Sequence, residues 1–311
     1  MERSSDYQPI ISIGMPVFNC ARTIAQAISS ILNQEFKEWE LLIIDDGSTD
    51  GTYQIAASFD DPRIIAIKGG ENKRLPARLN ECIDLAKGRF FARMDGDDIA
   101  YPGRLLCQLD FLLSHPDVDL FGGWVVVFRN DGTAFGARRG PLTHEEICAR
   151  PWQSISMAHP TWMGRIEWFR RNYYRPVAAS EDQELLFRTY QSSRFATVPE
   201  VVLGYREDSL SMRYILFQRW HVCMRILRNA RAQHRYARAA FGIAGQAAKA
   251  LVDAIAICTG LKYHILKHRA APLRDQEEIE WRSVWEQVRI TSDRSLIQDS
   301  FALETPQDSA V

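Results

Sequence analysis

Along the first hundred residues, short runs of consecutive apolar residues alternate with longer segments whose apolar residues recur every three or four positions. The runs are IISIGMPVF, WELLIIDD, RIIAIK and RFFARM, which begin at positions 10, 39, 63 and 89. A run that is apolar at nearly every position is typical of a strand buried on both faces, whereas the longer spacing is typical of a helix with one buried face. Strands that alternate with helices in this way predict an α/β fold, with a doubly wound mixed sheet flanked by helices.

Two of these helices have recognisable ends. Ser48, Thr49 and Asp50 can each cap a short helix that reaches Ala57, because their side chains accept hydrogen bonds from free backbone N–H groups. The helix after the third run is expected to end at Gly88, because glycine is favoured at the C-terminal end of a helix.

The second half of the chain has a weaker pattern and a helical end. The runs DLFGGWVVVF and ATVPEVVLGYR predict two more strands, THEE predicts a capping box between Thr143 and Glu146, and SEDQELLFRTY predicts a helix. Beyond about position 214 every segment has a helical pattern. We therefore divide the chain into a main α/β domain over residues 1–212, a basic helical appendage over 213–274 and an acidic C-terminal tail over 275–311.

The composition is that of a soluble globular protein, with 46% hydrophobic and 25% charged residues and a net charge of −1. Bulk charge therefore does not point to a nucleic-acid partner. The six cysteines form no CxxC pair, which is typical of reduced thiols in a cytosol. The N-terminal residues do not resemble a signal peptide, and no run of 18 uncharged apolar residues predicts a spanning helix. We expect a cytoplasmic protein.

Charge is unevenly distributed, however. Residues 213–274 contain twelve Lys and Arg residues and one acid, Asp253, and five of the arginines (225, 228, 231, 235 and 238) recur at helical spacing. The mostly apolar segment AAFGIAGQAAKALVDAIAICTGL follows at position 239. This combination predicts helices that lie on an anionic membrane surface, which would make the enzyme peripheral on the inner face. The alternative is an appendage that packs on the main domain with a solvated basic face.

Three carboxylates, Asp95, Asp97 and Asp98, directly follow the fourth apolar run. Like charges this close repel one another unless a cation lies among them. They stand at the carboxyl end of a predicted strand, as do Asp45 and Asp46, and this is where ligands bind in doubly wound sheets. The acid cluster therefore predicts a Mg²⁺ or Mn²⁺ site; a turn with solvated acids is the alternative.

Two further charged groups have both a functional and a structural interpretation. Lys73, Arg74 and Arg78 can clamp a diphosphate, or remain solvated on a helix surface. Glu181 and Asp182 begin a predicted helix, so one of them can act as a general base, or both can simply interact favourably with the helix dipole.

The weakly patterned region between positions 129 and 175 contains three more candidates. His159, Trp162 and Trp168 can contact an acceptor substrate, or serve as core and loop packing. The choice between these roles is not determined by spacing.

The motifs in combination resemble the inverting family 2 glycosyltransferases. The segments that carry the resemblance are SIGMPVFNCARTIAQAISSILNQEFKEWELLIIDDGSTDGT, ENKRLPARLNECIDLAKGRFFARMDGDDIAYPGRL, HPTWM and SEDQELLFR, which occur in the family's order and spacing over about residues 9–207. The resemblance implies the nucleotide-diphospho-sugar transferase (GT-A) fold. It also implies transfer of a sugar from a nucleotide-diphospho-sugar, with a UDP-sugar expected, to a glycan or lipid-linked acceptor in cell-surface polysaccharide synthesis.

The resemblance also assigns roles to individual residues. It implies a nucleotide-sugar site formed by Pro16, Val17, Phe18, Asp46, Arg74 and Asp95. Phe18 occupies the position of the family's usual Tyr, so it keeps a ring for stacking and lacks the hydroxyl group. Asp97 would be the main ligand of Mn²⁺ or Mg²⁺, with Asp95 beside it near the ribose.

At the acceptor side, Asp182 would be the catalytic base, and Glu181 would support it or bind the acceptor. Asp98 would lie behind the metal ligands. The chemistry needs these groups, because the leaving diphosphate must be neutralised and the attacking hydroxyl must lose its proton.

Three other functions are less consistent with the sequence. A sugar-1-phosphate nucleotidylyltransferase would need a glycine-rich basic loop, which GMPVFNCART does not provide. A non-catalytic sugar-nucleotide or lipid-binding protein would not need the candidate catalytic acids, all of which are present. A processive synthase would carry Gln where Leu216 stands. The arginine stripe lacks interleaved aromatic residues, so we expect no nucleic-acid partner.

Overall fold

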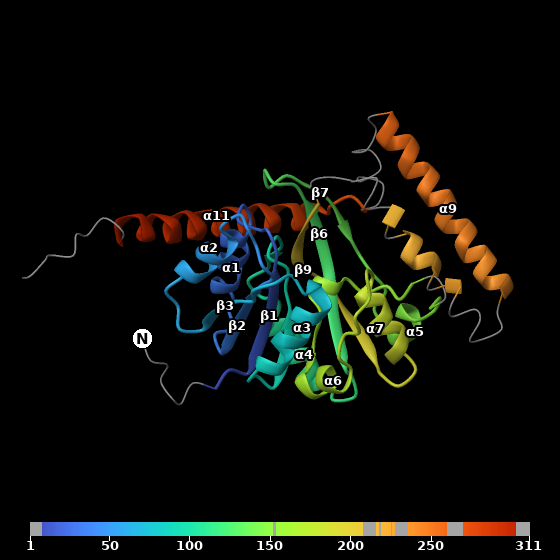
Figure 1. Ribbon diagram of the computed structural model, residues 1–311, viewed down its shortest axis with the longest axis horizontal. Coiled ribbons are helices and arrows are strands. Elements are labelled where there is room, and N and C mark those ends of the chain that lie inside the picture. Colours follow the sequence, from blue (N-terminus) through green and yellow to red (C-terminus); the bar gives the residue numbers. More distant parts are fainter. Residues whose placement is uncertain are drawn as a thin grey trace, which may run out of the picture.

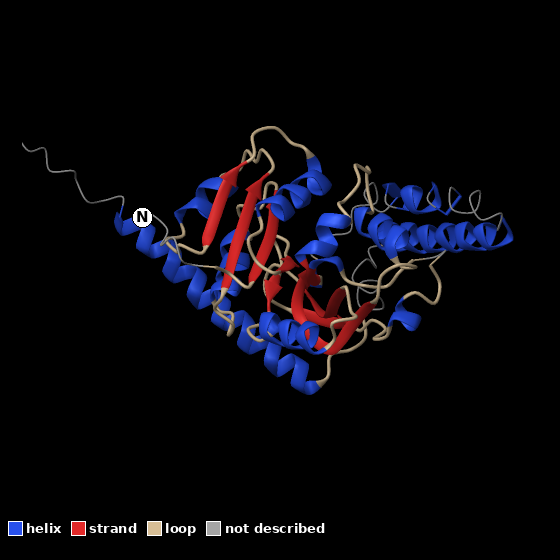
Figure 2. Ribbon diagram, turned by 90° about the horizontal axis from the view of Figure 1, so that it is seen from below, coloured by secondary structure: helices blue, strands red, loops and turns tan. Residues whose placement is uncertain are grey.

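The computed structural model describes residues 8–151, 154–207, 216–217, 219–224, 226–227, 236–259 and 270–302. Nine strands form one mixed sheet (Figures 1 and 2): β1 (Ile11–Val17), β2 (Trp39–Asp45), β3 (Ile64–Lys68), β4 (Phe90–Arg93), β5 (Ile99–Ala100), β6 (Leu120–Phe128), β7 (Ala134–Arg138), β8 (Met163–Arg165) and β9 (Phe195–Arg206). The spatial order is β3-β2-β1-β4-β8-β6-β9-β5, with β7 paired to β6. The predicted doubly wound mixed sheet is confirmed.

The first four strands form the parallel part of the sheet. β1 lies between β2 and β4, and β3 continues beyond β2. Val17 pairs in register with Asp45, so the last residues of β1 and β2 lie side by side at one edge. This edge carries the loops in which the candidate site residues were predicted.

Alternation along the strands explains why both faces of the sheet are covered. In β2, Leu41 and Ile43 belong to one hydrophobic cluster, and Leu42 and Ile44 belong to the other. The first cluster includes residues of α1 (Ile24–Leu32), α2 (Thr52–Ser58) and α4 (Arg104–Ser114). The second includes residues of α3 (Arg74–Leu85), α6 (Ile166–Arg171) and α7 (Glu181–Thr189).

The region that was weakly patterned in sequence forms short elements. They are β7, α5 (His144–Ile147) and the 3₁₀ turn η1 (His159–Thr161). The predicted capping box is confirmed, because the Thr143 side chain accepts from the Glu146 N–H and the Glu146 side chain accepts from the Thr143 N–H.

Two predicted helix ends differ from the structure. α3 ends at Leu85, followed by Ala86 with an extended backbone, and does not reach Gly88. Gly88 instead lies against β1, where a Cβ atom would come within 2.6 Å of the Ser12 backbone nitrogen, so glycine is needed for close approach. α2 is preceded by Gly51 in a left-handed conformation, while Asp50 Oδ1 accepts from the Thr52 N–H at 3.1 Å.

The C-terminal residues contribute two long helices. Residues 275–302, which we set apart as an acidic tail, form α11 (Asp275–Ala302), and its Trp281, Val284 and Val288 complete a hydrophobic cluster with residues of β5 and β6. α9 (Tyr236–Cys258) lies at the opposite end of the molecule from β3 (Figure 1). None of the described helices is long and apolar enough to cross a membrane. The side chains of the predicted arginine stripe lie outside the described residues.

Candidate functional site

The three clustered aspartates lie in the loop that follows β4. Ligand atoms of Asp95, Asp97 and Asp98 all lie within 4.8 Å of one another. The Asp98 side chain is buried; its Oδ1 accepts from the Arg206 N–H at 2.9 Å, and its Oδ2 has no hydrogen-bond partner among the described residues. Burial, followed by the charge of Asp95, raises the pKa of Asp97 to about 6. Burial, Asp97 and Asp95 raise the pKa of Asp98 well above its usual value.

This donor set fits a hard divalent cation. Three carboxylates within one ligand-sized space repel one another, and a buried oxygen without a donor is costly to leave unsatisfied. The raised pKa values express the same imbalance, since they mean that the cluster lacks positive charge. Oxygen ligands of this kind suit Mg²⁺ or Mn²⁺. The structure therefore provides a place for the predicted metal ion.

Two arginines hold this loop from opposite sides. Arg93, which is buried at the end of β4, places Nη1 2.5 Å from Asp95 Oδ2. Arg206, the last residue of β9, donates from Nε to the Asp97 backbone oxygen at 2.6 Å and lies over the Phe128 ring. Sequence reasoning missed both arginines. Arg206 reaches the loop only because β9 folds beside it, whereas Arg93 is only two residues from Asp95 and was predicted simply as part of a strand.

The predicted nucleotide-binding residues lie next to the acid cluster. Pro16 and Val17 are buried at the end of β1, and Phe18 is 48% exposed, so its ring is free to stack on a base. A Cβ atom on Gly96, between Asp95 and Asp97, would come within 2.7 Å of Val17 Cγ1. This close packing brings the end of β1 and the acid cluster together.

The loop after β2 supports the loop after β1. The Asn19 N–H donates to Ser48 Oγ at 2.9 Å, and Asn19 Oδ1 accepts from the Thr49 N–H at 3.0 Å. The Ala21 N–H donates to Asp50 Oδ2 at 3.0 Å. Ser48, Thr49 and Asp50, which were predicted to cap the following helix, therefore also fix the loop that carries Phe18.

Asp46 has a structural role that was not predicted. Its Oδ1 accepts from the Lys73 N–H and from Arg78 Nε, both at 2.7 Å, and its Oδ2 accepts from the Arg74 N–H at 2.9 Å. Asp46 therefore holds the first turn of α3 beside the site. A carboxylate can accept about four hydrogen bonds, so Oδ2 keeps the capacity for one more donor, and the predicted contact with a base stays a prediction.

The three basic residues at the start of α3 differ in their surroundings. Arg78 is buried, and its guanidinium contacts Asp46, Glu81 and backbone oxygens. Lys73 pairs with Glu81 at 3.3 Å. The Arg74 side chain is exposed, lines a cavity of about 270 Å³ and makes no hydrogen bond within the described part of the chain. Of the three, Arg74 is best placed to meet a diphosphate.

The second pair of acids begins α7. Glu181 lies beside His159, with 3.8 Å between Oε1 and Nδ1, and His159 Nε2 lies 2.8 Å from the Tyr174 hydroxyl. Burial, followed by the charge of Asp182, raises the pKa of Glu181. Burial, followed by the charge of Arg93, lowers the pKa of His159 well below its usual value, so this imidazole is neutral at pH 7.

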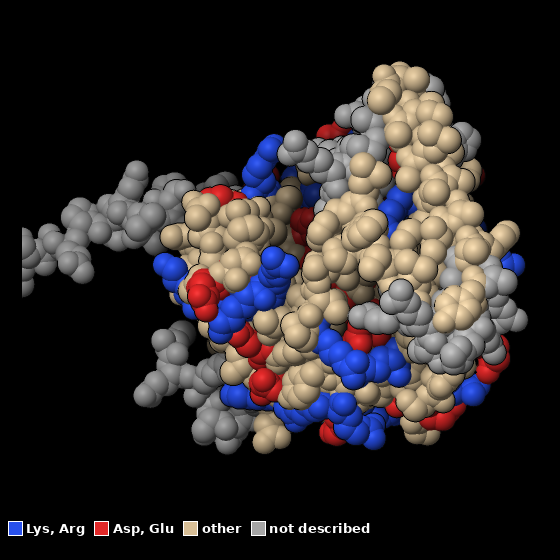
Figure 3. All heavy atoms as spheres, turned by 45° about the vertical axis from the view of Figure 1, so that its right-hand side comes forward, with Lys and Arg blue, Asp and Glu red and all other residues tan. Residues whose placement is uncertain are grey.

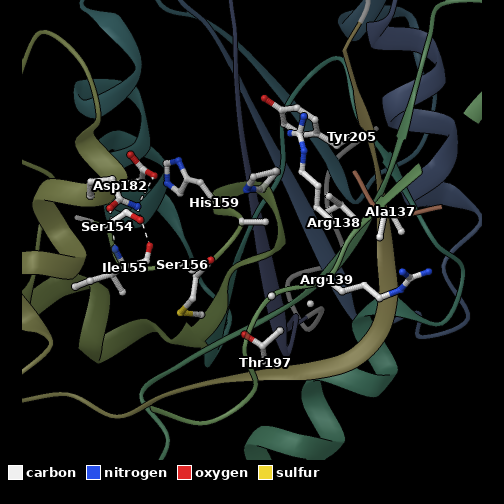
Figure 4. Close-up of a pocket in the computed structure, with 18 residues that line it drawn as sticks. Ala137, Arg138, Arg139, Ser154, Ile155, Ser156, His159, Asp182, Thr197 and Tyr205 are labelled. Atoms are coloured by element: carbon white, nitrogen blue, oxygen red, sulfur yellow. Dashed lines mark hydrogen bonds between the residues drawn. The ribbon is translucent and has the colours of Figure 1, made fainter. Parts of the chain in front are cut away.

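Asp182 faces a cavity of about 640 Å³ (Figure 4). In this view Asp182 and His159 lie on one side, and Arg138, Arg139 and Tyr205 lie on the other. The two arginines on the far side are already paired with acids, Arg138 with Glu207 and Arg139 with Glu277. The cavity therefore offers a carboxylate beside a space large enough for a sugar-sized group.

His159 is the one aromatic candidate that lines this cavity, since Trp162 and Trp168 are buried in a hydrophobic cluster of the core. The packing interpretation is therefore correct for the two tryptophans. Sequence spacing could not distinguish these cases, because all three residues lie within the weakly patterned region, His159 and Trp162 in HPTWM and Trp168 a few residues later.

Residues with a strained backbone lie in or next to the loops that carry the candidate site residues. Three non-glycine residues of the described chain have a positive φ: Asn19 at 52°, Arg74 at 70° and Ser180 at 59°. They are adjacent to Phe18, to the start of α3 and to Glu181. Conformations of this kind cluster at functional sites, where the surrounding structure holds them in place.

A family sequence profile and known relatives agree with this geometry. The profile of glycosyl transferase family 2 matches residues 12–172. The putative glycosyltransferase EpsE of Bacillus subtilis is 39% identical over 210 residues, covering 65% of this chain and 74% of EpsE. The UDP-Glc:alpha-D-GlcNAc-diphosphoundecaprenol beta-1,3-glucosyltransferase WfgD of Escherichia coli is 34% identical over 121 residues, covering 39% of this chain and 48% of WfgD.

Solved structures share the fold. TarS of S. aureus, in complex with UDP-GlcNAc, has a TM-score of 0.52 at 18% identity and covers 69% of this chain and 65% of its own. The mannosyltransferase PcManGT of Pyrobaculum calidifontis, in complex with GDP-Man and Mn²⁺, has a TM-score of 0.56 at 17% identity and covers 94% of this chain and 88% of its own. The predicted GT-A fold is thereby confirmed.

Proposed function

The chain belongs to glycosyl transferase family 2, and on that premise we propose that it transfers a sugar from a nucleotide-diphospho-sugar to a hydroxyl group of a glycan or lipid-linked acceptor, with inversion at the anomeric carbon. We expect a UDP-sugar as the donor. The observation that supports this most strongly is the placement of two sets of acids on either side of Arg93. Arg93 contacts Asp95 directly, and its charge influences the pKa of both Glu181 and His159.

The acid cluster would hold the metal ion. Asp97 and Asp95 provide the ligands, and the unpartnered Oδ2 of Asp98 supports them from behind. A bound Mn²⁺ or Mg²⁺ would neutralise the charge that develops on the leaving diphosphate. Arg93 and Arg206 keep the carboxylates in place, so little reorganisation is needed as that charge develops.

The donor would lie across the ends of β1, β2 and β4. The exposed ring of Phe18 gives the base a surface for stacking, and Asp46 Oδ2 can accept one hydrogen bond from it. Arg74 would reach the diphosphate from the start of α3. The buried residues Pro16 and Val17 keep this surface rigid.

Asp182 would remove the proton from the acceptor hydroxyl. It faces the 640 Å³ cavity, whereas its neighbour Glu181 is directed toward His159. Because His159 is neutral, it does not neutralise Asp182 or Glu181 by forming a charged pair. A carboxylate in this position takes up the proton as the new glycosidic bond forms, which contributes about 10²–10⁴-fold to the rate.

The relatives favour an acceptor in surface polysaccharide synthesis. WfgD acts, by its name, on a diphosphoundecaprenol-linked sugar, and TuaG of Bacillus subtilis is named as a putative teichuronic acid biosynthesis glycosyltransferase. We place the reaction in the cytoplasm, at the inner face of the membrane when the acceptor is lipid-linked.

Two conservative substitutions test these roles. Asp182→Asn should reduce transfer by about 100-fold or more while donor binding is retained, because only proton removal is lost. Asp97→Asn should reduce transfer and also metal-supported donor binding. Asp110→Asn, on the exposed side of α4, is the matched control and should change neither. Full transfer activity in either site variant would remove that residue from the mechanism.

The same assay distinguishes the other enzyme class. A glycosyltransferase releases a nucleoside diphosphate, whereas a sugar-1-phosphate nucleotidylyltransferase exchanges pyrophosphate. Detection of pyrophosphate exchange without release of nucleoside diphosphate would contradict the proposed function.

A further inference from the structure

The segment between β9 and α11 contains two helices that contact each other through polar groups. We call them the helix pair: the described helical residues of 216–227, and α9. Arg219 Nε donates to Asp253 Oδ2 at 3.2 Å, and Arg219 Nη1 donates to Gln246 Oε1 at 2.9 Å. Ile226 packs near Ile243, so the two helices run antiparallel. Asp253, the one acid of residues 213–274, is buried in this contact.

The outward side of α9 is apolar. Phe241 is 72% exposed, Leu251 62% and Ile255 54%, and these positions share one face of the helix. The alanines and the glycine between them on this face are exposed as well. Lys249 is the one charged residue exposed among the described side chains of α9. In the space-filling view the surface of α9 is drawn almost entirely as uncharged residues (Figure 3).

The first helix of the pair has the same arrangement. Phe217, Trp220, Met224 and Leu227 recur every three or four residues, and all four are exposed. Trp220 is 64% exposed, although tryptophan normally buries most of its surface. Surface helices of soluble proteins place apolar residues inward and polar residues outward, so both helices are inverted relative to that rule. Exposed apolar surface on this scale marks an interaction site.

We propose that the outward faces of the helix pair dock into the interfacial region of an anionic lipid bilayer. The positive charge of the segment favours anionic lipid over a second copy of the chain as the partner. Residues 213–274 carry twelve basic residues against one acid, and that acid is paired and buried. A second copy of the chain would bring the same positive charge and be repelled, whereas anionic headgroups attract it. Helices with an apolar face and basic residues nearby lie in the plane of such a surface.

The dimensions of α9 agree with a helix that lies flat. Its 23 residues span about 35 Å at 1.5 Å per residue. Its apolar surface is not continuous, because Gln246 and Asp253 of α9 bind Arg219. No described helix is long and apolar enough to cross a membrane. The pair would therefore be embedded by one side, with the Arg219 contacts between the helices kept away from lipid.

Both chain ends of this segment return to the acceptor cavity. Tyr205, in β9, precedes the helix pair and lines the cavity, and Ala271, which follows it, also lines the cavity. Ala271 is fixed there by two backbone hydrogen bonds to Ala137 in β7, of 2.8 and 2.9 Å. Docking of the pair would therefore bring the cavity close to the membrane. This part of the inference rests on the proposed function, since it gives the lipid-linked acceptor a route to Asp182.

Flotation of the full-length protein with vesicles tests the docking face. Wild-type protein should float with vesicles of phosphatidylglycerol and phosphatidylcholine at low salt, and much less with phosphatidylcholine alone. Leu251→Asp/Ile255→Asp should weaken binding by about tenfold or more, because two charges enter the apolar face. The control Leu113→Asp/Ile279→Asp changes two residues of similar exposure, 50% and 63%, on α4 and α11 and should float normally.

A second measurement does not depend on charged variants, which could lose vesicle binding because they unfold. Ala248→Cys, on the outward face of α9, carries a polarity-sensitive fluorophore without adding charge. Its emission should shift to the blue with anionic vesicles. The inference is overturned if wild-type protein stays in the soluble fraction at low salt, or if both double variants lose vesicle binding equally. It is also overturned if the outward face holds a dimer that Leu251→Asp/Ile255→Asp dissociates. Nucleoside diphosphate release, measured without vesicles, reports separately on the proposed function.

Discussion

Carboxylates outnumber the cations around them at the centre of the site. This excess of negative charge is visible in the hydrogen bonds and pKa values of individual residues. Asp98 keeps one buried oxygen for which the described part of the chain provides no donor, and the pKa values of Asp97 and Glu181 are raised. Arg93 contacts Asp95 and influences Glu181, and Arg206 contacts the Asp97 backbone, but these two guanidiniums do not balance the carboxylates of Asp95, Asp97, Asp98, Glu181 and Asp182. These residues are held in an arrangement that favours ligand binding over the stability of the empty fold.

The raised pKa of Glu181 predicts a pH effect. An acid whose pKa is raised by folding stabilises the protein below its unfolded value of 4.5, and that contribution is lost as the pH rises through the higher folded value. Glu181→Gln should therefore increase the melting temperature slightly at pH 7.5. It should also move the acid limb of the kcat/KM profile to lower pH, because the variant lacks this titration. Glu167→Gln, an exposed control on α6, should alter neither.

Arg206 gives a second prediction at this scale. It donates to the Asp97 backbone oxygen, to Gln26 Oε1 at 2.7 Å and to Asn130 Oδ1 at 3.2 Å. Lysine keeps the charge but not this set of directed hydrogen bonds. Arg206→Lys should weaken Mn²⁺-supported nucleotide binding by about tenfold, a loss of about 1.4 kcal/mol. Calorimetry measures this, with the exposed Arg282→Lys as control; unchanged affinity would mean that the Asp97 loop does not depend on Arg206.

Among the elements, α11 contributes more than its sequence suggested. We set its residues apart as an acidic tail, yet Trp281 is buried against Phe128 and Tyr101, and its Nε1 donates to the Gly132 backbone oxygen at 2.8 Å. Trp285 lies near both Phe128 and Arg206, so α11 supports the ends of β6 and β9, and Arg206 in turn contacts the acid cluster.

Removing this support should be costly. Trp281→Ala is expected to destabilise the protein by about 3–5 kcal/mol, as for other buried aromatic residues. Ile279→Ala, two residues away on the solvent side of α11, should change the free energy of unfolding by less than about 0.5 kcal/mol. Chemical denaturation measures both. If the two variants unfold alike, α11 is an attached tail and not a part of the main domain.

The helices and strands that follow from local sequence patterns could be predicted, whereas most contacts between distant elements could not. Buried strands and the helices between them follow from local periodicity, so β1 to β4 and the acid cluster were found directly. The contacts of Arg206 with Asp97 and of Asp46 with α3 were not, because each joins segments that are far apart in sequence and meet only in the folded chain. Gly88 was misassigned for the same reason: its close neighbour is β1, a partner far away in sequence. The contact of Arg93 with Asp95 is local, at a separation of two residues, but the predicted strand did not assign a role to Arg93.

At the scale of the whole molecule, the all-parallel part of the sheet and its mixed part provide the two halves of the site. The ends of β1, β2 and β4 carry the residues proposed for the nucleotide and the metal. The second part, with η1, α7 and β9, encloses the cavity that Asp182 faces. The helix pair extends from the second part, so the proposed membrane contact and the acceptor side belong to the same half.

The most direct test of this account is a calorimetric titration of UDP into the purified protein, with Mn²⁺ present and again with the metal removed by EDTA. GDP serves as the comparison nucleotide, and Asp97→Asn as the variant that lacks one proposed ligand. We predict that UDP binds with Mn²⁺, that EDTA weakens binding by about tenfold or more, and that Asp97→Asn shows the weak binding under both conditions. If neither nucleotide binds with Mn²⁺, or if affinity is equal with and without the metal, the acid cluster does not hold a sugar nucleotide through a divalent ion.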